Sequence, residues 1–175
     1  MAVGGLPSRE EEVMRIVLSR IDNRLLHGVV ATQWAPRVGA QRIMVIDDET
    51  ASNEIAKSSM RLARPAGMAI SIISLDTALA NFSASKYEDQ TIFIITKVPG
   101  TLRRLMEGAD VPIKEVDVGA TEQRDIAEGI TEVNRRVTLD GSERDDYRWL
   151  IEHGVKVYAQ YLPSEKPQPL DEFLQ

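Results

Sequence analysis

The sequence predicts an α/β fold: a doubly wound, mostly parallel open sheet with helices on both faces. Three observations support this prediction. Short apolar runs rich in Ile and Val recur along the chain, as buried parallel strands require. Segments with the apolar period of a helix lie between these runs. The 175 residues, of which 43% are hydrophobic, suit one compact domain with a core on each side of the sheet.

The N-terminal segment differs from the rest of the chain. Residues 1–13 contain Gly, Pro and the acidic run Glu10–Glu12, but no apolar period. We therefore expect residues 1–13 to be a flexible lead and residues 14–175 to form a single domain. Met14 directly precedes the first strand-like run and is a candidate for the true start.

Six apolar runs have the length and composition of strands. They are Arg15–Ser19, Arg42–Asp47, Met68–Ser74, Thr91–Thr96, Lys114–Val118 and Val155–Gln160. One further strand is expected within Glu132–Leu139, followed by a turn at Asp140 and Gly141.

Helical patterns occupy the intervals between these strands. The residues that share a helical face are Val30, Trp34 and Val38 after the first strand, Ala51, Ile55 and Leu62 after the second, and Tyr147, Leu150 and Ile151 near the C-terminus. Gly154 is expected to end the last of these helices, and Leu170–Leu174 to form one final helical turn.

The composition argues against several classes of function. Apolar runs such as Thr91–Thr96 are too short to span a bilayer, and the first residues lack a secretory pattern, so we expect a cytoplasmic protein. With no cysteine and two histidines, no disulfide, thiolate or structural zinc site is expected, and we expect no cofactor. A formal charge of −6 argues against nucleic-acid binding.

The segment Arg20–Gly28, RIDNRLLHG, carries the residues best suited to chemistry. It lies between the first strand and a helical pattern, and ligands of open α/β sheets bind beside the carboxyl ends of strands. A helix beginning near Gly28 would direct its N–H groups and positive dipole end at this loop, and glycine lets the backbone approach closely. The same field favours a neutral imidazole on His27, whose free lone pair can attack phosphorus.

Three neighbours of His27 have candidate roles in binding or orienting a phosphoryl group. The guanidinium of Arg24 can grip two phosphoryl oxygens, and Arg20 adds a second positive charge at the strand end. Asp22 can orient the imidazole N–H or hold an arginine. A histidine before a glycine more often begins a helix, and Arg/Asp pairs usually form surface salt bridges, so spacing alone leaves both readings open.

The motif RIDNRLLHG closely resembles the active-site loop of sorbose/mannose-type IIB components of the bacterial phosphoenolpyruvate-dependent sugar phosphotransferase system. The likeness extends to Arg42–Ala51, Pro65, Val116–Gly119 and Glu152–Pro163. It implies that His27 accepts a phosphoryl group from a IIA protein and transfers it to sugar at the membrane IIC and IID components, with Arg24 binding phosphate. The implied activity is that of a protein-Npi-phosphohistidine:sugar phosphotransferase, cytoplasmic and peripheral to the membrane transporter complex.

Two residues depart from the pattern of this family. Val29 stands where the family usually has Gln, and Asp117 stands where Asn is common. Because Val29 bears on transfer to sugar, one alternative is a regulatory phosphoprotein of the same fold that uses His27 without sugar transfer. A nucleotide-dependent enzyme would need a glycine-rich phosphate loop after the first strand, which the sequence lacks. A further alternative is a pure binding module, which would accept no phosphate. Which sugar is carried and the oligomeric state are open.

Other residues have weaker signals. Lys97 can add charge to the phosphate site if its strand neighbours the first, with solvation as the alternative. His153 is expected to cap a helix end, and Trp34 and Trp149 to pack in the core. A IIA partner must bring its phosphohistidine to His27, so exposed apolar and basic residues are expected around the loop. The candidates for this docking surface are Leu25, Leu26, Arg20 and Arg24.

Overall fold

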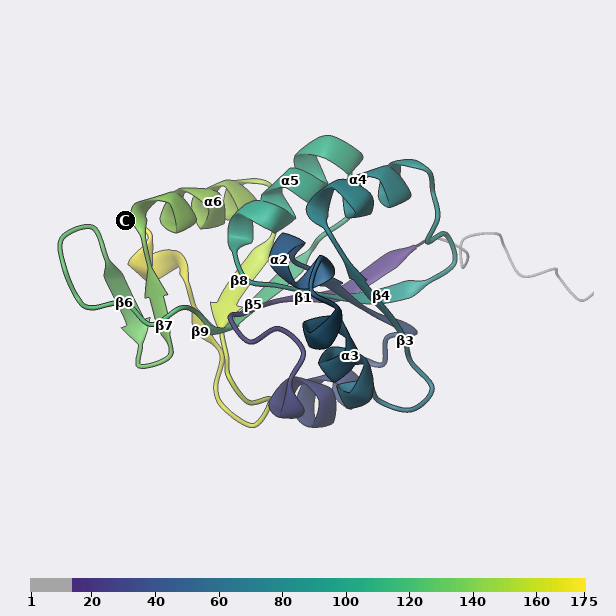
Figure 1. The fold of residues 1–175 in the computed structure, drawn as a ribbon. Coiled ribbons are helices and arrows are strands. Elements are labelled where there is room, and N and C mark those ends of the chain that lie inside the picture. Colours follow the sequence, from purple (N-terminus) through teal and green to yellow (C-terminus); the bar gives the residue numbers. More distant parts are fainter. Residues whose placement is uncertain (1–13) are drawn as a thin grey trace, which may run out of the picture.

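The computed structural model describes residues 14–175, and its centre is a seven-stranded sheet (Figure 1). The strand order is β3-β2-β4-β1-β5-β8-β9, and every neighbouring pair is parallel except β8 with β9. The strands are β1 Arg15–Asp22, β2 Arg42–Ile46, β3 Ala69–Ile73, β4 Thr91–Thr96, β5 Glu115–Ala120, β8 Lys156–Ala159 and β9 Gln168–Pro169. The predicted fold class is confirmed.

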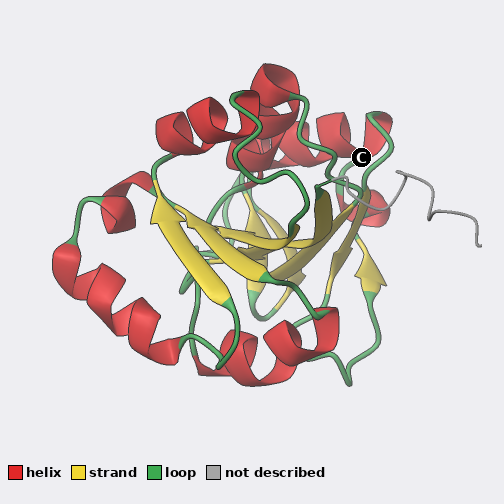
Figure 2. Ribbon diagram, turned by 90° about the vertical axis from the view of Figure 1, so that its right-hand side faces the viewer, coloured by secondary structure: helices red, strands yellow, loops and turns green. Residues whose placement is uncertain are grey.

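Helices cover both faces of the sheet, as Figure 2 shows. The face covered by α4, α5 and α6 is the upper one in Figure 1. The helical elements are η2 Val30–Trp34 and α1 Ala35–Val38 after β1, α2 Asp48–Ala51 and α3 Glu54–Ala63 after β2, α4 Leu75–Ser83, α5 Pro99–Ala109, α6 Gly141–Glu152 and the 3-10 turn η3 Asp171–Phe173. The last of these confirms the helical turn expected within Leu170–Leu174.

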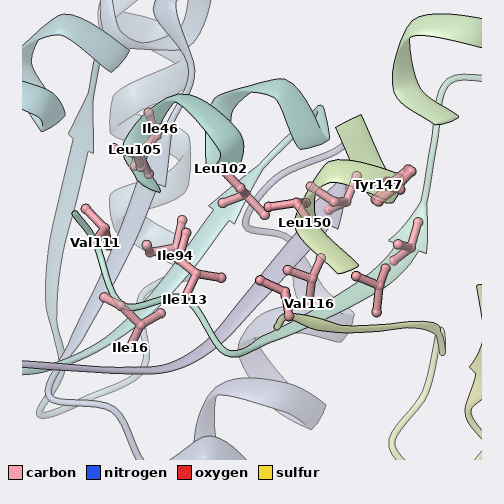
Figure 3. Packing of buried hydrophobic residues seen from close by; sticks show 14 of the residues in the cluster. Ile16, Ile46, Ile94, Leu102, Leu105, Val111, Ile113, Val116, Tyr147 and Leu150 are labelled. Carbon is pink, nitrogen blue, oxygen red and sulfur yellow. The ribbon is translucent and has the colours of Figure 1, made fainter. Parts of the chain in front are cut away.

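Each face of the sheet has its own apolar core. The larger core packs residues of α4, α5 and α6, such as Phe82 of α4, against the sheet. Figure 3 shows Leu102 of α5 and Leu150 of α6 within it. The smaller core lies on the other face, where Val30 and Trp34 of η2 pack. Burial on two faces explains why the strands read as continuous apolar runs in the sequence.

β1 occupies the position in the sheet where a ligand site is expected. It lies between β4 and β5, and Arg20 stands beside Asp117 in the register of β1 with β5. The connection from β1 passes β4 to reach β2, whereas the connection from β4 passes β1 to reach β5. The two connections therefore run in opposite directions along the strand order. Ligands of doubly wound sheets bind at such a reversal, beside the carboxyl ends of the strands.

The segment expected to be one strand within Glu132–Leu139 is an antiparallel hairpin, so that prediction was wrong in part. Its strands are β6 Thr131–Asn134 and β7 Val137–Leu139. The turn expected at Asp140 and Gly141 is the start of α6. Asp140 accepts from the Glu143 N–H at 2.8 Å, and the Glu143 carboxylate accepts from the Asp140 N–H at 3.0 Å. This capping box begins the helix.

The helical face expected for Ala51, Ile55 and Leu62 is not one face of one helix. The chain breaks between α2 and α3, and the Asn53 side chain caps α3 by accepting from the Ala56 N–H at 3.0 Å. Ile55 is 82% exposed and Leu62 is 90% exposed, because α3 turns Met60 and Ala63 toward the sheet instead.

The flexible lead expected at the N-terminus lies outside the described residues, whereas Met14 lies within them. Residues 1–13 are not among the described residues, so their expected flexibility stays a prediction. Met14 is partly buried against the larger core, and β1 begins at the next residue. Between Met14 and Gln175, no helix has the length and apolarity needed to cross a membrane.

Candidate active site

The loop of residues 23–27 follows β1 at the centre of the sheet and carries His27. Leu25 and Leu26 are buried in the smaller core and anchor it. Leu25 has a φ of 57°, a left-handed conformation that a leucine adopts only where surrounding contacts hold it. Its N–H donates to the Asp22 carbonyl at 3.0 Å, and the Asn23 N–H donates to the Ala120 carbonyl at 3.0 Å. The loop is therefore fixed by both packing and backbone hydrogen bonds.

The side chain of Asp22 joins the parts of the site. It is fully buried, and its Oδ1 accepts from the Arg24 N–H at 3.0 Å. Its Oδ2 lies 3.1 Å from His27 Nε2 and 3.2 Å from an Arg20 guanidinium nitrogen. One carboxylate thus contacts the loop backbone, the imidazole and a buried cation, and the orienting role expected for Asp22 stays a prediction.

The imidazole of His27 has one nitrogen engaged and one free. Since an ionised carboxylate only accepts hydrogen bonds, Nε2 carries the hydrogen that faces Asp22. No group in residues 14–175 forms a hydrogen bond with Nδ1, and the side chain is 9% exposed. In the neutral ring, Nδ1 is then the atom with an available lone pair.

A helical segment begins at His27, as expected. The His27 carbonyl accepts from the Ala31 N–H at 2.9 Å, which leaves the N–H groups of the first turn, beginning at Gly28, without acceptors inside the helix. A Cβ placed on Gly28 would meet no atom within 4 Å, so the space beside this backbone is open. Free N–H groups and the helix dipole both favour an anion here.

This segment contains an irregularity that the sequence pattern did not predict. The Ala35 N–H donates to the Val30 carbonyl, the wider spacing of a π-helical turn. Pro36 follows directly and lacks an N–H, which removes one regular helical hydrogen bond. The turn places Trp34 so that its indole N–H donates to the Tyr161 carbonyl at 2.8 Å, and Trp34 is buried as expected.

Arg24 is the exposed basic residue of the loop. Its backbone is held by Asp22, whereas its guanidinium forms no ion pair with any residue from 14 to 175. A planar guanidinium three residues before His27, free of a carboxylate partner, is suited to grip the oxygens of a phosphoryl group.

Arg20 is buried, and this overturns its expected place on a docking surface. Its guanidinium contacts Asp22 and Asp117, and it donates to the carbonyls of Gln160 at 3.1 Å and Tyr161 at 3.3 Å. Leu25 and Leu26 are buried as well, which leaves Arg24 as the exposed member of the expected set. Because the loop packs into the core, its apolar residues stabilise the loop and are not available to a partner.

Gly119 makes room for the Arg20 guanidinium. A Cβ at this position of β5 would coincide with the guanidinium carbon and nitrogens, so no other residue fits without moving Arg20. The aromatic faces of Trp34 and Tyr161 lie 4.9 Å and 5.9 Å from the guanidinium carbon. The Arg20 guanidinium is therefore enclosed, and its contact nearest to His27 is the one with Asp22.

Asp117 is the second carboxylate beside Arg20 and is fully buried. Burial raises the pKa of Asp117 to about 7, although the Arg20 charge opposes that rise, and the nearby negative charge of Asp22 adds to it. Among the described residues its Oδ1 has no hydrogen-bond partner, which fits a carboxyl group that holds a proton more readily than usual.

The two remaining polar candidates lie apart from His27 or pair elsewhere. β4 does neighbour β1, but the Lys97 ammonium lies 3.4 Å from Asp47 and 3.8 Å from Glu49. His153 is the C-cap of α6, where its Nδ1 lies 2.7 Å from the Trp149 carbonyl and its ring stacks on the Trp149 ring at 3.8 Å. The expected helix-capping position of His153 is confirmed.

Comparison with known proteins gives the family. The family model described as "PTS system sorbose subfamily IIB component" matches residues 16–175. The chain belongs to this family. The resemblance found in the active-site loop is thereby confirmed, and the chain is a IIB component of the sugar phosphotransferase system.

Relatives with assigned names agree with this family. The N-acetylgalactosamine-specific phosphotransferase enzyme IIB component 1 of Escherichia coli K12 is 31% identical over 156 residues, covering 89% of this chain and 96% of the relative. The mannose-specific EIIAB component of the same strain is 30% identical over 159 residues, covering 91% of this chain and 48% of the relative.

Solved structures show the same fold. The crystal structure of the IIBSor domain of the sorbose permease from Klebsiella pneumoniae superposes with a TM-score of 0.83 at 29% identity. The superposition covers 92% of this chain and 96% of the IIBSor domain.

Proposed function

We propose that this IIB component carries a phosphoryl group on Nδ1 of His27, accepting it from a IIA protein and passing it to an incoming sugar at membrane IIC and IID components. The observation that carries the proposal is the 3.1 Å contact between His27 Nε2 and Asp22, which leaves Nδ1 as the free nucleophile. Membership in the IIB family supports it.

The geometry supports a simple sequence of bond changes. The lone pair of Nδ1 attacks the phosphorus of a phosphohistidine on the IIA protein, so one N–P bond forms as the other breaks. The exposed Arg24 guanidinium and the N–H groups of the first helical turn stabilise the charge on the transferring oxygens. In the second step a sugar hydroxyl attacks the same phosphorus and loses its proton to water, the N–P bond of His27 breaks, and Nδ1 regains its lone pair.

Asp22 and Arg20 act as positioning residues in this scheme. The Nε2–H of His27 stays bonded to Asp22 throughout both steps, which stabilises the positive charge that the ring gains when Nδ1 is phosphorylated. Arg20 holds Asp22 through a fully buried ion pair at 3.2 Å. The ring is therefore held in one orientation by Asp22, which Arg20 positions in turn.

The names of relatives support the choice of partners. One relative is a single chain described as a mannose-specific EIIAB component, and this chain matches about half of it, 48%. Fusion of IIA and IIB units in that protein supports direct transfer between such units here. Delivery to sugar at IIC and IID components would place the chain at the membrane surface as a peripheral subunit.

A second candidate function rests on Val29. This residue follows Gly28, where the family usually has Gln, and its side chain is partly buried against the smaller core, so it offers no polar group beside His27. A chain that accepts phosphate but does not pass it to sugar would be a regulatory phosphoprotein of the same fold.

Phosphorylation with a defined donor tests both candidates. After incubation with a phosphorylated IIA protein, the intact mass should rise by one phosphoryl group, and the group should be lost in acid and kept in alkali. Nitrogen-15 NMR of the histidines should assign the phosphate to Nδ1. Adding membranes that contain IIC and IID should then discharge it onto sugar, whereas the regulatory candidate keeps it. An alkali-labile adduct or a phosphate on Nε2 would contradict the proposed site.

A further inference from the structure

The outward face of α3 carries two large apolar side chains that nothing in the described chain covers. Ile55 is 82% exposed and Leu62 is 90% exposed. They are seven residues apart, two helical turns, and so lie on one line of the helix surface. Ser58 and Ser59, both exposed, lie between them. Isolated exposed apolar residues are ordinary, whereas an aligned pair on one helix is a candidate contact surface.

This face is self-complementary. Ile55 lies three residues before Ser58, and Leu62 lies three residues after Ser59. When two copies of α3 pair antiparallel about a two-fold axis at Ser58 and Ser59, Ile55 of each copy meets Leu62 of the other. The two serines at the centre are small, which lets the helices approach closely. A surface that mirrors itself in this way fits a second copy of the chain better than an unrelated partner.

The charges on one flank of α3 are self-complementary as well. Glu54 and Arg61 are also seven residues apart and lie on the same flank of the Ile55–Leu62 line. In the antiparallel pair, Glu54 of each copy lies two residues, or about 3 Å along the helix axis, from Arg61 of the other. The long arginine side chain spans this offset, so two reciprocal ion pairs can form. The Glu54 side chain is 79% exposed and has only Lys57 at 3.6 Å, and Arg61 forms no ion pair with any residue from 14 to 175.

We propose that the chain self-associates through α3, as a two-fold antiparallel helix pair centred on Ser58 and Ser59. The helix of ten residues is about 15 Å long, so the contact is small for a specific interface. The dimer is accordingly weak, with a dissociation constant of about 10–1,000 μM. α3 contributes none of the described contacts of His27, Asp22 or Arg20, so dimer formation leaves the phosphoryl site intact.

Single cysteines test the geometry cleanly, because the native chain has none. Ser58→Cys and Ser59→Cys place the new thiol beside its copy near the axis, within reach of a disulfide. Under mild oxidation at high protein concentration, at least one of them should form a covalent dimer. Ser83→Cys, on an exposed position of α4, should stay monomeric and serves as the control. Equal cross-linking of all three variants would overturn the proposal.

Charge exchange tests the pairing itself by sedimentation equilibrium. Glu54→Arg alone and Arg61→Glu alone each bring like charges together and should weaken association about tenfold or more. The double variant restores opposite charges and should recover the native dissociation constant to within about threefold. Ile55→Ser should abolish association without lowering the melting temperature, because the side chain is exposed.

Two results would overturn the two-fold pairing. One is a native chain that stays monomeric at about 1 mM, the weak end of the expected range. The other is a double charge variant that associates no better than the single ones. If the native chain is monomeric and Ile55→Ser slows phosphoryl uptake from a phosphorylated IIA protein, the face is instead a docking surface for that partner.

Discussion

The two histidines of the chain both lie at helix ends, and their surroundings are opposite. His27 begins the helical segment after β1, and its Nε2 faces the buried Asp22 carboxylate at 3.1 Å. His153 ends α6, and its Nδ1 lies 2.7 Å from the Trp149 carbonyl. His27 lies at the end of a helical segment where N–H groups have no acceptor inside the helix, whereas His153 lies beside the carbonyls that end a helix.

This difference is the reason why we propose His27, and not His153, as the phosphoryl carrier. A helix N-terminus attracts an anion, and a helix C-terminus repels it. The ring of His153 is also stacked on the Trp149 ring at 3.8 Å, so one of its faces is covered. Residue type is therefore not sufficient, since chemistry depends on the polarity of the helix end and on which ring nitrogen is already engaged.

The largest expected effect separates these two histidines directly. His27→Ala should abolish phosphoryl uptake from a phosphorylated IIA protein, because no other described residue combines a free ring nitrogen with a helix N-terminus. His153→Ala should be labelled at the native rate. Intact-mass measurement at fixed times gives both rates. Labelling of His27→Ala at the native level would remove His27 from its proposed role.

The next effect concerns the carboxylate that orients the ring of His27. Asp22→Asn keeps one acceptor oxygen but loses the negative charge that stabilises the phosphorylated ring, so uptake should slow by about a hundredfold. Because the ring is held less firmly, part of the phosphate should appear on Nε2, which nitrogen-15 NMR detects. A purely structural role would lower the melting temperature and leave the phosphate on Nδ1 alone.

A smaller effect is expected at Arg24. Arg24→Lys keeps the charge but loses the planar pair of donors, so transfer should slow by roughly ten- to a hundredfold. Its melting temperature should match the native one, because the guanidinium is exposed and unpaired in residues 14–175. Arg37→Lys, on an exposed position of α1, is the matched control and should transfer at the native rate. Equal rates for the two variants would mean that Arg24 does not bind the phosphoryl group.

The strands could be predicted from the sequence because burial on both faces requires continuous apolar runs. The β6–β7 hairpin could not, because its turn lacks the Asn-Gly or Asp-Gly signal of tight hairpins. Asn134 makes the turn instead, with its side chain accepting from the Arg136 N–H at 2.8 Å. The helical period correctly placed Ile55 and Leu62 on one face of α3, but it could not show that this face is exposed or that the chain breaks between Ala51 and Ile55.

The site residues that are close together in the sequence could be predicted, whereas the contacts with distant residues could not. His27, Asp22 and Arg24 lie within one motif, and Asp22 contacts both the His27 ring and the Arg24 backbone N–H. The burial of Arg20 depends on the carbonyls of Gln160 and Tyr161, which are brought to it by the order of β1, β5 and β8. The sequence signal that could have predicted this burial is Gly119, since a glycine inside a strand often marks a place where another group approaches the backbone closely.

A dependence of stability on pH is expected near His27 and not near His153, because buried charged groups surround His27 and not His153. Asp117 has its pKa raised to about 7 from an ordinary value of 3.8, mainly by burial. Between these values the folded chain holds a proton on Asp117 that the unfolded chain has released. Folding then takes up a proton, so the contribution of Asp117 to stability falls as pH rises through this window and is constant above pH 7.

Asp117→Asn puts the residue common in the family at this position and removes the titrating carboxyl group. The fall in stability with rising pH that Asp117 causes should therefore disappear. The difference in melting temperature, native minus variant, should decrease from pH 5 to pH 7 by at most about 5 °C per pH unit, because one proton corresponds to about 1.4 kcal/mol per pH unit.

Asp125→Asn, at an exposed position, should give a curve parallel to the native one and controls for the loss of a surface charge. Thermal unfolding monitored by circular dichroism at several pH values yields all three curves. The remaining titrating groups are shared and cancel in the difference. Parallel curves for the native chain and Asp117→Asn would mean that Asp117 stays ionised beside Arg20 throughout this range, and that the trio of Asp22, Arg20 and Asp117 keeps a fixed charge behind His27.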